Sequence, residues 1–367
     1  MRDPGSWLER VWSDGASAPV GAALSALSAG YRAGLVARTR LYRWGLLRSG
    51  RLPCPVVSIG NLTLGGSGKT PLVELAVKTL AALGASPAVV SRGYRRETRG
   101  VQIVADRDGI RLGPRAAGDE PFLLAERLPR TPVVVGENRY DAGRVAVEQL
   151  QASVVVLDDG FQNRTIDKDL EILVVNGRAP WGSGRLFPRG TLREPLGALR
   201  RAHTIVVTNP PPGDEIGPIE RAIRRHGAAA PILTAAYQPL EARRAGSGER
   251  LAPPALAGRR LLAFAGLGFP RGFAETLVAA SVQVAGLAEF ADHHWYSAQD
   301  LSDLAARARA TGAEGLITTE KDGVRLRDLA LPDLPLWILS VKMSLEQNRD
   351  AWVRALRGVS AAALAER

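Results

Sequence analysis

The stretch GNLTLGGSGKTP, residues 60–71, decides how the rest of this chain is interpreted. It follows the apolar run PVVSI (55–59) and leads into PLVELAVKTLAAL (71–83), an order that predicts a buried strand, a glycine loop and a helix. Backbone N–H groups of such a loop, together with the helix N-terminus, can surround phosphate groups. The ending Gly-Lys-Thr matches the phosphate-binding P-loop, but position 63, where that pattern has glycine, holds Thr63.

The residues of this loop have separate predicted roles. The glycines let the backbone approach phosphate oxygens that a side chain would block. Lys69 supplies positive charge for the β- and γ-phosphates, and the Thr70 hydroxyl is placed to bind Mg²⁺. The alternative, a glycine-rich turn with a surface lysine, is disfavoured by the flanking strand and helix. ATP and Mg²⁺ are therefore the expected ligands, and the predicted ATP-binding residues are Asn61, Gly65, Gly66, Ser67, Gly68, Lys69 and Thr70.

A second apolar run ends in two carboxylates. SVVVLD (153–158) closes with Asp158, and Asp159 follows it. P-loop enzymes hold Mg²⁺ with an acidic residue at the end of a neighbouring strand. We expect Asp158 to bind the cation, directly or through water, and Asp159 to help orient its ligands. A polar turn that merely ends a strand is the alternative.

Further apolar runs recur along the chain, separated by helical segments. Runs of this kind predict strands buried on both faces of a parallel sheet, and their alternation with helices predicts an α/β doubly wound fold. The runs are PAVV (87–90), VQIV (101–104), PVVVG (132–136), LEILVV (170–175) and TIVV (204–207).

The composition changes after about residue 230. A stretch rich in Gly, Pro, Ala and Arg follows, which we interpret as a connector with room for a hairpin. A second α/β unit then includes LLAFAGLG (261–268), GLITTEKD (315–322) and LPLWILSV (334–341), and SAAALAER (360–367) is expected to be a frayed tail. The predicted parts are an N-terminal helical segment (1–54), a P-loop domain (55–230), a connector (231–260) and a C-terminal α/β domain (261–367).

The charge balance indicates an anionic partner. Lys and Arg number 48 against 37 Asp and Glu, a formal charge of +11. Such an excess suits nucleic acid, acidic lipid or a phosphorylated substrate, although an arginine-rich proteome gives the same surplus. One cysteine, Cys54, excludes an intramolecular disulfide and fits a reducing cytoplasm.

The N-terminal region lacks the basic start and apolar run of a signal peptide. Its first low-charge stretch, residues 18–31, ends at Arg32 and is shorter than the ~20 apolar residues of a spanning helix. Arginines then alternate with leucines and Trp44 as far as Arg51. This pattern predicts a helix lying in a membrane interface; packing on the protein's own core is the alternative.

The departure at Thr63 helps to choose a family. Partition and cell-division switch ATPases carry a signature lysine just before the glycine pair, where this chain has Leu64. The longer string GNLTLGGSGKTP closely resembles the tetraacyldisaccharide 4'-kinases, the lipid A 4'-kinases of Gram-negative bacteria. Seven further segments match that family in order: SRGYRR (91–96), GDEP (118–121), LDDGFQ (157–162), GRLFPRGTLREP (184–195), FAGLGFP (264–270), ADHHWY (291–296) and TTEKD (318–322).

The resemblance implies an activity and a setting. It implies transfer of the ATP γ-phosphoryl group to the 4'-hydroxyl of a lipid-linked tetraacyl glucosamine disaccharide 1-phosphate. It also implies a P-loop NTPase-type sheet, a second, smaller α/β domain and a strand-like linker, with the active site between the domains. The expected partners are the anionic lipid and the cytoplasmic face of the inner membrane, contacted peripherally, with no nucleic acid and no protein partner.

The resemblance also assigns roles to residues. Asp119 and His293 are expected to act together on the attacking hydroxyl, with Lys69 on the transferred group; from sequence alone, Asp119 is equally well explained as a helix start. Positions near substrate or nucleotide are Tyr94, Arg139, Gln162 and Glu194. Asn163 stands where the family usually has histidine, which puts one substrate contact in doubt. TTEKD is equally well explained by helix capping through Thr319 and Asp322, so it stays outside the predicted site.

Two other functions remain open at this point. One is a P-loop switch ATPase associated with a membrane or DNA, which Leu64 and the lack of a nucleic-acid-binding motif disfavour. The other is a small-molecule kinase or ligase on the same scaffold, with the basic helix only packing against the protein.

Overall fold

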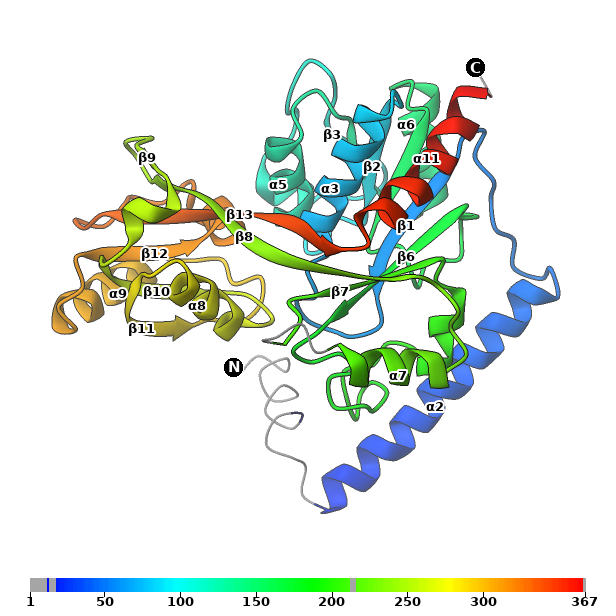
Figure 1. The fold of residues 1–367 in the computed structure, drawn as a ribbon, viewed down its shortest axis with the longest axis horizontal. Coiled ribbons are helices and arrows are strands. Elements are labelled where there is room, and N and C mark those ends of the chain that lie inside the picture. The colour runs from blue at the N-terminus through cyan, green and yellow to red at the C-terminus, as the bar shows by residue number, and fades with distance from the viewer. Residues whose placement is uncertain (1–11, 13–17, 212–215, 366–367) are drawn as a thin grey trace.

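The computed structural model describes residues 12, 18–211 and 216–365 (Figure 1). The polar N-terminal start discussed above, apart from Trp12 and the residues from 18 onward, lies outside this range. So do the last two residues.

One mostly parallel sheet runs through the described residues, in the order β11-β10-β12-β13-β8-β7-β6-β1-β5-β2-β4-β3, with β9 paired to β8. Its first unit has β1 at the centre, flanked in parallel by β5 and β6, which confirms the predicted α/β class. The strands of this unit are β1 (Val56–Asn61), β2 (Pro87–Ser91), β3 (Gln102–Ala105), β4 (Val133–Val135), β5 (Val154–Asp158), β6 (Leu170–Asn176) and β7 (Thr204–Thr208).

The strand at residues 101–104 differs from the expectation of a parallel strand buried on both faces. β3 pairs antiparallel with β4 at the edge of the sheet, and Gln102 and Ile103 are only half-buried. An edge strand has one neighbour and needs cover on fewer sides, so an apolar run of four residues does not by itself fix burial or direction.

Two long strands join the units. β8 (Ile232–Arg244) pairs parallel with β7 at its start and antiparallel with β13 (Leu336–Gln347) along the rest. The expected connector therefore begins as part of a strand, which turns back through the short β9 (Arg250–Leu251). The second unit adds β10 (Arg260–Ala265), β11 (Gln283–Glu289) and β12 (Gly315–Thr319), and Figure 1 shows β8 and β13 crossing to it.

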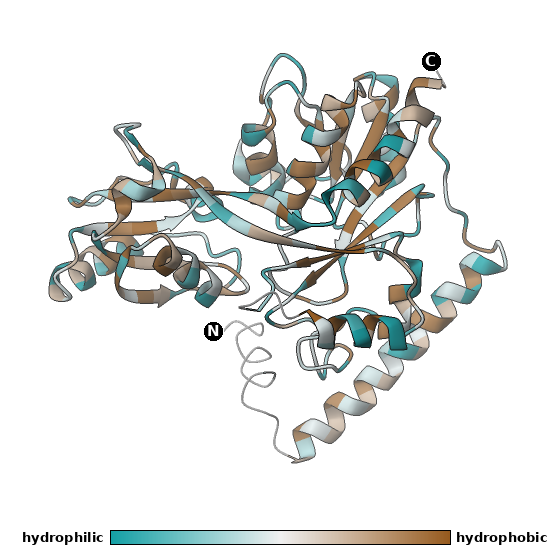
Figure 2. Cartoon of the chain, viewed as in Figure 1, coloured by the Kyte–Doolittle hydropathy of each residue, from teal (hydrophilic) through white to brown (hydrophobic). Residues whose placement is uncertain are grey.

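Helices cover both faces of the sheet, and apolar side chains fill the space between, as the brown strands in Figure 2 show. The helices of the first unit are α2 (Ala18–Arg43), α3 (Lys69–Ala82), α4 (Pro114–Ala117), α5 (Asp119–Arg127), α6 (Arg139–Glu148), η1 (Leu196–Arg201) and α7 (Gly217–Arg225). The later ones are η2 (Pro253–Leu256), α8 (Pro270–Ala279), α9 (Ala298–Ala310), α10 (Glu320–Leu326) and α11 (Arg349–Ala365).

The last helix corrects the expectation of a frayed tail for residues 360–365. α11 returns to the first unit, where Trp352 and Leu356 are fully buried in the same cluster as α3. Ser360 donates from Oγ to the carbonyl of Leu83 at 3.2 Å. The small residues of SAAALA suit close packing against α3, so their low complexity reflects a helix–helix contact. By packing, α11 belongs with the first unit although it follows the second along the chain.

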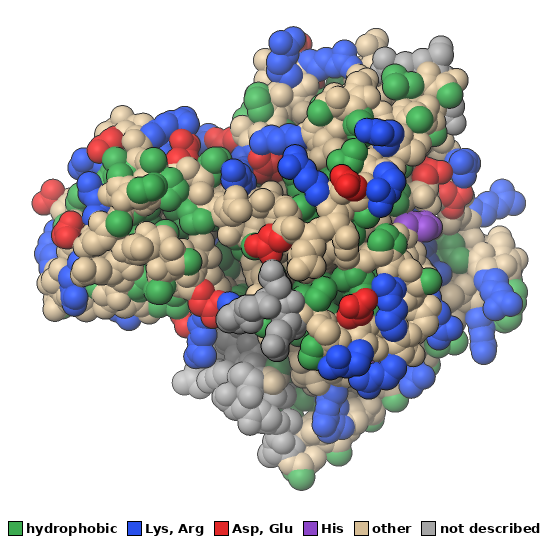
Figure 3. All heavy atoms as spheres, in the orientation of Figure 1, with side chains coloured by type: hydrophobic (Ala, Val, Ile, Leu, Met, Phe, Trp, Pro, Cys, Tyr) green, Lys and Arg blue, Asp and Glu red, His purple; other side chains and the backbone are tan. Residues whose placement is uncertain are grey.

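Helix α2 is longer than the sequence expectation for an apolar stretch that ends at Arg32. It continues through the arginines to Arg43 and, by length and composition alone, is long and apolar enough to cross a membrane, with 11% of its most apolar stretch buried. It lies along the outside of the first unit (Figure 1). Figure 3 shows Lys and Arg side chains gathered around α2 and α7, on the face turned to the viewer.

Candidate active site

The glycine loop connects β1 to α3 as predicted, and neighbouring strands fix its shape. Gly68 caps α3 with a φ of 83°, a backbone conformation that favours glycine. Thr208, at the end of β7, donates from Oγ1 to the carbonyl of Ser67 at 2.9 Å. Asn176, at the end of β6, donates from Nδ2 to the carbonyl of Gly66 at 3.2 Å. The carboxyl ends of β6 and β7 thus fix the backbone of the glycine loop.

Lys69 lies beside polar groups from both β1 and β5. Its Nζ donates to Asn61 Oδ1 at 3.1 Å and lies 3.6 Å from Asp159 Oδ1. Arg193, which the sequence analysis did not single out, donates from Nη1 to both oxygens of Asp159 at 2.8 and 2.9 Å. Although burial opposes it, the charges of Lys69 and Arg193 hold the pKa of Asp159 well below its ordinary value. Asp159 is therefore ionised and paired in this arrangement.

Asp158 has a different environment. Ser91 donates from Oγ to its Oδ2 at 3.0 Å, while its buried Oδ1 has no hydrogen-bond partner among the described residues. Burial, then the negative charges of Glu120 and Asp159, raise the pKa of Asp158 to about 7. A buried carboxylate oxygen without a partner fits a divalent cation, whose positive charge would offset the negative charges of Asp158, Asp159 and Glu120.

The described residues hold no group of three or more His, Cys, Asp or Glu side chains arranged for a metal ion. Proteins usually bind Mg²⁺ through one or two carboxylates, while phosphate oxygens and water supply the other ligands. Asp158, with Thr70 in the first turn of α3, is the pair of residues that fits such an ion.

Asp119 and His293 are in contact, although they are 174 positions apart and belong to different units. His293 Nδ1 lies 2.9 Å from Asp119 Oδ2 and 3.1 Å from Oδ1. Burial opposes ionisation, but the hydrogen bond from His293 and the charges of Lys321 and Arg325 lower the pKa of Asp119 to about 2. His293 has a φ of 61°, a conformation uncommon outside glycine, so the loop before α9 is bent to present this side chain.

Lys321 is part of the same cluster and was left outside the predicted site. Its Nζ lies 3.3 Å from His293 Nε2, 3.0 Å from Glu120 Oε1 and 3.5 Å from Asp292 Oδ1. The ammonium only donates and the Asp119 carboxylate only accepts. His293 satisfies both neighbours with its hydrogen on Nδ1, so Lys321 helps to hold the ring toward Asp119.

The four residues predicted near substrate or nucleotide have different surroundings. Tyr94 is exposed and meets the His293 ring edge to face at a centroid distance of 5.3 Å. Gln162 donates from Nε2 to the carbonyl of Asn61 at 2.8 Å, beside the glycine loop. Arg139 is buried and donates to the carbonyls of Gly136 and Glu137, and burial lowers its pKa to about 10. Glu194 is buried in a two-point pair with Arg201, at 2.6 and 3.0 Å.

The second unit also meets the glycine loop directly. A side chain at Gly268 would lie 2.7 Å from the backbone nitrogen of Gly66, so only glycine allows this approach. Tyr237 of β8 has its hydroxyl against Gly68. The glycine loop, the paired carboxylates and the Asp119–His293 contact therefore surround one region between the units.

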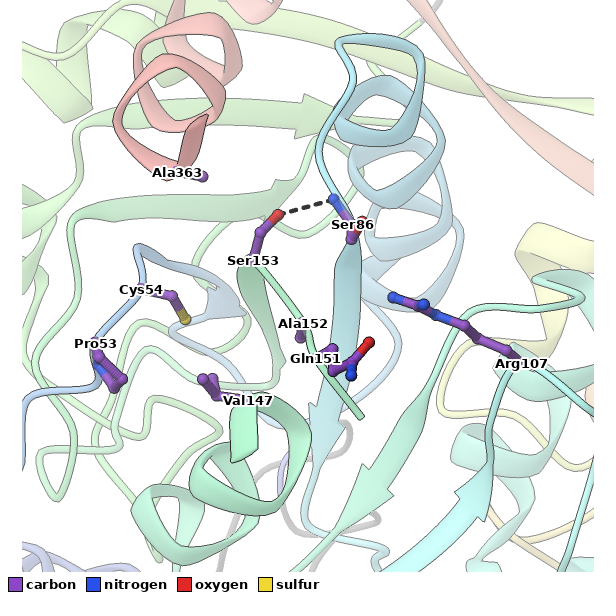
Figure 4. A pocket seen from close by; sticks show the side chains of 9 residues that line it. All are labelled: Pro53, Cys54, Ser86, Arg107, Val147, Gln151, Ala152, Ser153 and Ala363. Carbon is purple, nitrogen blue, oxygen red and sulfur yellow. Dashed lines mark hydrogen bonds between the residues drawn. The ribbon is translucent and has the colours of Figure 1, made fainter. Parts of the chain in front are cut away.

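A separate cavity of about 440 Å³ opens where β1, β2 and β5 begin (Figure 4). Cys54 and Ser86 lie among its lining residues, and Ser153 Oγ accepts from the backbone nitrogen of Ser86 at 2.8 Å. Parallel α/β sheets bind ligands at the opposite ends of their strands, where the glycine loop lies. We therefore assign the chemistry to the glycine-loop side.

Comparison with known proteins agrees with this geometry. The family model described as tetraacyldisaccharide-1-P 4'-kinase matches residues 20–358. The chain belongs to the tetraacyldisaccharide 4'-kinase family. It is 38% identical over 357 residues to the tetraacyldisaccharide 4'-kinase of Syntrophus aciditrophicus (strain SB), covering 93% of this chain and 95% of that one. The corresponding protein of Anaeromyxobacter sp. (strain Fw109-5) is also 38% identical, with 96% of each chain covered.

A solved structure of a family member has a similar fold. The LpxK of Aquifex aeolicus, crystallised in complex with ATP, has a TM-score of 0.74 and 31% sequence identity to this chain. The likeness covers 93% of this chain and 99% of that one. This tetraacyldisaccharide 4'-kinase family member is therefore a kinase with an ATP-binding P-loop fold, and the switch ATPase alternative is set aside.

Proposed function

We propose that this kinase transfers the γ-phosphoryl group of ATP to the 4'-hydroxyl of a lipid-linked tetraacyl glucosamine disaccharide 1-phosphate. The observation that carries the proposal is the contact between Asp119 and His293 across the two units, beside Glu120, whose charge acts on Asp158 at the acidic strand end. A nucleotide switch needs the glycine loop and the acidic strand end. It does not need a buried carboxylate–imidazole pair. Phosphoryl transfer to a hydroxyl group does need such a pair, because the hydroxyl must lose its proton as the new bond to phosphorus forms.

The residues divide the reaction between them. In our proposal, the glycine loop and Lys69 hold the β- and γ-phosphates, and Lys69 neutralises charge that develops on the transferred group. Asp119 accepts the proton of the 4'-hydroxyl, and His293 orients the Asp119 carboxylate. A carboxylate with a pKa of about 2 is a weak base before ATP binds, but the negative charge of a nearby triphosphate raises its affinity for a proton.

We propose that Mg²⁺ binds with Asp158 and Thr70. The ion, when bound with ATP, would neutralise phosphate charge during transfer. The partnerless Oδ1 of Asp158 supports this assignment. Asp159 stays paired with Lys69 and Arg193 and positions them. In the same proposal Tyr94, Arg139, Gln162 and Glu194 belong to the substrate and nucleotide surroundings, Glu194 by fixing Arg201.

We also propose that α2 contacts the cytoplasmic face of the inner membrane, where the lipid acceptor resides. Its mostly exposed apolar length and its arginines support this, since basic residues beside apolar anchors bind anionic lipid surfaces. In the proposed division at residues 54, 230 and 260, with α11 packed back on the P-loop unit, the chemistry takes place between the P-loop unit and the C-terminal unit.

One assay tests the activity. ATP labelled on its γ-phosphate is offered with the disaccharide lipid, and the products are separated by chromatography. We expect labelled lipid from the native protein and a loss of about 10²-fold or more for Lys69→Ala, because such electrostatic contacts have effects of that size. Lys78→Ala, which removes an exposed lysine of the same helix, is the control. ATP turnover without labelled lipid would contradict the proposal.

A further inference from the structure

The loop that carries His293 is held by the first unit through a second residue besides Asp119. This residue is Arg95, in the segment that follows β2, 197 positions before Asp292. Its Nη1 donates to the backbone carbonyl of Asp292 at 3.2 Å and to that of His293 at 3.5 Å. The guanidinium also lies 5.6 Å from the centre of the Tyr94 ring, which itself meets the His293 ring. Arg95 thus links the two units beside the Asp119–His293 contact.

The backbone of Arg95 is itself unusual. Its φ of 57° lies in the left-handed region that favours glycine. Residues other than glycine persist in such conformations where the surrounding structure determines them, and they concentrate at functional sites. Glycine at this position would remove the backbone cost, but it would also remove the guanidinium. An arginine here therefore indicates that the side chain has a role.

The two carbonyls that Arg95 binds flank a single residue. The Asp292 carbonyl precedes the N–Cα bond of His293, and the His293 carbonyl follows its Cα–C bond. The φ and ψ of His293 set the relative direction of these two carbonyls, and its φ of 61° is again in the left-handed region. A donor that binds both carbonyls therefore favours the backbone conformation that presents the imidazole to Asp119.

The second unit holds the same loop at other positions. The backbone nitrogen of His293 donates to the carbonyl of Gly266 at 3.3 Å, and the buried Arg325 donates from Nη1 to the carbonyl of His294 at 3.1 Å. These two contacts stay within the second unit, so they fix the loop on its own unit only. Arg95 belongs to the first unit, and its hydrogen bonds fix the loop relative to that unit.

The exposure of the Arg95 hydrogen bonds determines what kind of effect they can have. Both lie at the surface, where water competes for the guanidinium, so their contribution to the stability of the fold is expected to be small. A shift of a catalytic side chain by about 1 Å, in contrast, can lower a rate by ~10²-fold. Arg95 should therefore affect catalysis more than folding.

We propose that Arg95 is a positioning residue for phosphoryl transfer, which binds the carbonyls of Asp292 and His293 across the two units and so holds the imidazole against Asp119. The inference rests on the proposed function, because Arg95 acts through the residue that orients the proton acceptor. It adds to that function a residue outside the Asp119–His293 pair that sets the geometry between the units.

The first test measures kcat together with the KM for ATP and for the lipid acceptor. Arg95→Met should lower kcat by about 10-fold, the lower end of the range for hydrogen bonds of a charged group, with both KM values close to native. Arg95→Gly suits the backbone φ of 57° but lacks the donor, so it should lose as much. Arg95→Lys should recover part of the rate, because an ammonium can donate to one of the carbonyls.

Arg99→Met is the matched control, since it removes an exposed arginine from the same segment, and it should keep the native kcat. A native kcat in Arg95→Met or Arg95→Gly would overturn the inference. A loss that appears in the KM for the acceptor instead of kcat would also overturn it, because Arg95 would then bind the substrate.

A double-variant cycle separates positioning from a general structural role. In a His293→Ala background, Arg95→Met should lower kcat little further, because Arg95 acts through the imidazole. The urea midpoint of Arg95→Met should stay close to that of the native protein. An equal loss of kcat in both backgrounds, or a loss that follows a lower midpoint, would show that Arg95 does not act through His293.

Hydrogen exchange gives a readout that does not depend on activity. With ATP present, the backbone amides of residues 290–296 should exchange faster in Arg95→Met and Arg95→Gly than in the native protein and Arg99→Met. Equal exchange rates would contradict the inference. Faster exchange in the two Arg95 variants, together with no labelled lipid from the native protein, would instead refute the proposed function and leave the contact of Arg95 with this loop established.

Discussion

At the scale of single residues, the Asp119 carboxylate shows how neighbouring groups stabilise a buried charge. It is 5% exposed, and His293, Lys321 and Arg325 together outweigh the cost of burial. Its pKa falls from an ordinary 3.8 to about 2. A depressed pKa in the folded state stabilises the fold above the unfolded value, and this contribution is lost as pH falls toward the folded value.

This gives a prediction for acid stability. Between pH 5 and pH 2 the native protein should lose about 2 kcal/mol more unfolding free energy than Asp119→Asn, which has no carboxylate to protonate. Urea unfolding at several pH values in this range measures the difference. Asp108→Asn, at an exposed carboxylate, is the control and should follow the native curve. Parallel curves for Asp119→Asn and the native protein would contradict the assigned environment.

Lys321 gives a second prediction at this scale. Burial lowers its pKa, but the carboxylates of Glu120, Asp292 and Asp119 outweigh burial and hold the pKa above its ordinary value. Lys321→Met should therefore free the His293 ring and lower kcat by about 10²-fold, with little change in the KM for ATP. Lys321→Arg should recover part of the rate, and a native rate in Lys321→Met would show that the contact has no role in catalysis.

Local sequence signals explain why Lys321 was not predicted. Thr319 does cap α10, as the TTEKD pattern indicates, because its Oγ1 accepts from the backbone nitrogen of Asp322 at 3.2 Å. That capping accounts for the motif without reference to the lysine between. Only the folded chain brings Lys321 to Glu120, 201 positions away, so periodicity and capping patterns carry no sign of it.

At the scale of elements, α2 combines contact with the protein and exposure. Tyr31 donates to the carbonyl of Arg193 at 2.9 Å and Leu24 is buried, so one side of the helix packs on the first unit. Leu27, Trp44 and Leu46, in the helix and the turn after it, are 60%, 67% and 69% exposed. Exposed apolar side chains on a basic helix are expected to enter a lipid surface.

Replacing these three residues with glutamine tests the membrane role without removing the packed side of α2. Each apolar side chain that leaves lipid costs about 1.5–3 kcal/mol, so the triple variant should bind anionic vesicles at least ~10²-fold more weakly. The matched control replaces Leu240, Val278 and Leu331, which are exposed elsewhere, with glutamine. Unchanged vesicle binding of the α2 variant, or equal losses in both, would assign α2 to packing alone.

The elements that were predicted well are those with a strong local signal. The apolar runs before the glycine loop and before Asp158 form strands β1 and β5, as predicted. The direction of β3 and the packing of α11 were missed because both depend on distant partners. For the same reason, the contact of Arg193 with Asp159 was not foreseen, although Arg193 lies in a segment that matches the family.

At the scale of the whole molecule, the two units meet along α5 and α10. Arg127 pairs with Glu74 of α3 at 2.6 Å and with Glu320 of the second unit, and Lys321 pairs with Glu120. This seam of ion pairs ends at Asp119 and His293. The sequence analysis predicted that Asp119 and His293 act together. The long strands β8 and β13 connect the two units that carry these residues.

The central claim is that Asp119 and His293 act as one unit on the acceptor hydroxyl, and a double-variant cycle tests it most directly. His294 is the control: its Nε2 lies 3.1 Å from Asp300 and its ring stacks on Phe290, away from Asp119. Initial rates on the lipid acceptor are measured for Asp119→Ala, His293→Ala, the double variant and His294→Ala, with ATP binding measured separately.

Each single variant of the pair should lose about 10²–10⁴-fold in kcat while still binding ATP. The double variant should lose little more than the worse single variant, because residues that act as a unit are not additive. His294→Ala should stay close to the native rate. Losses that multiply in the double variant, or a native rate in His293→Ala, would contradict the account.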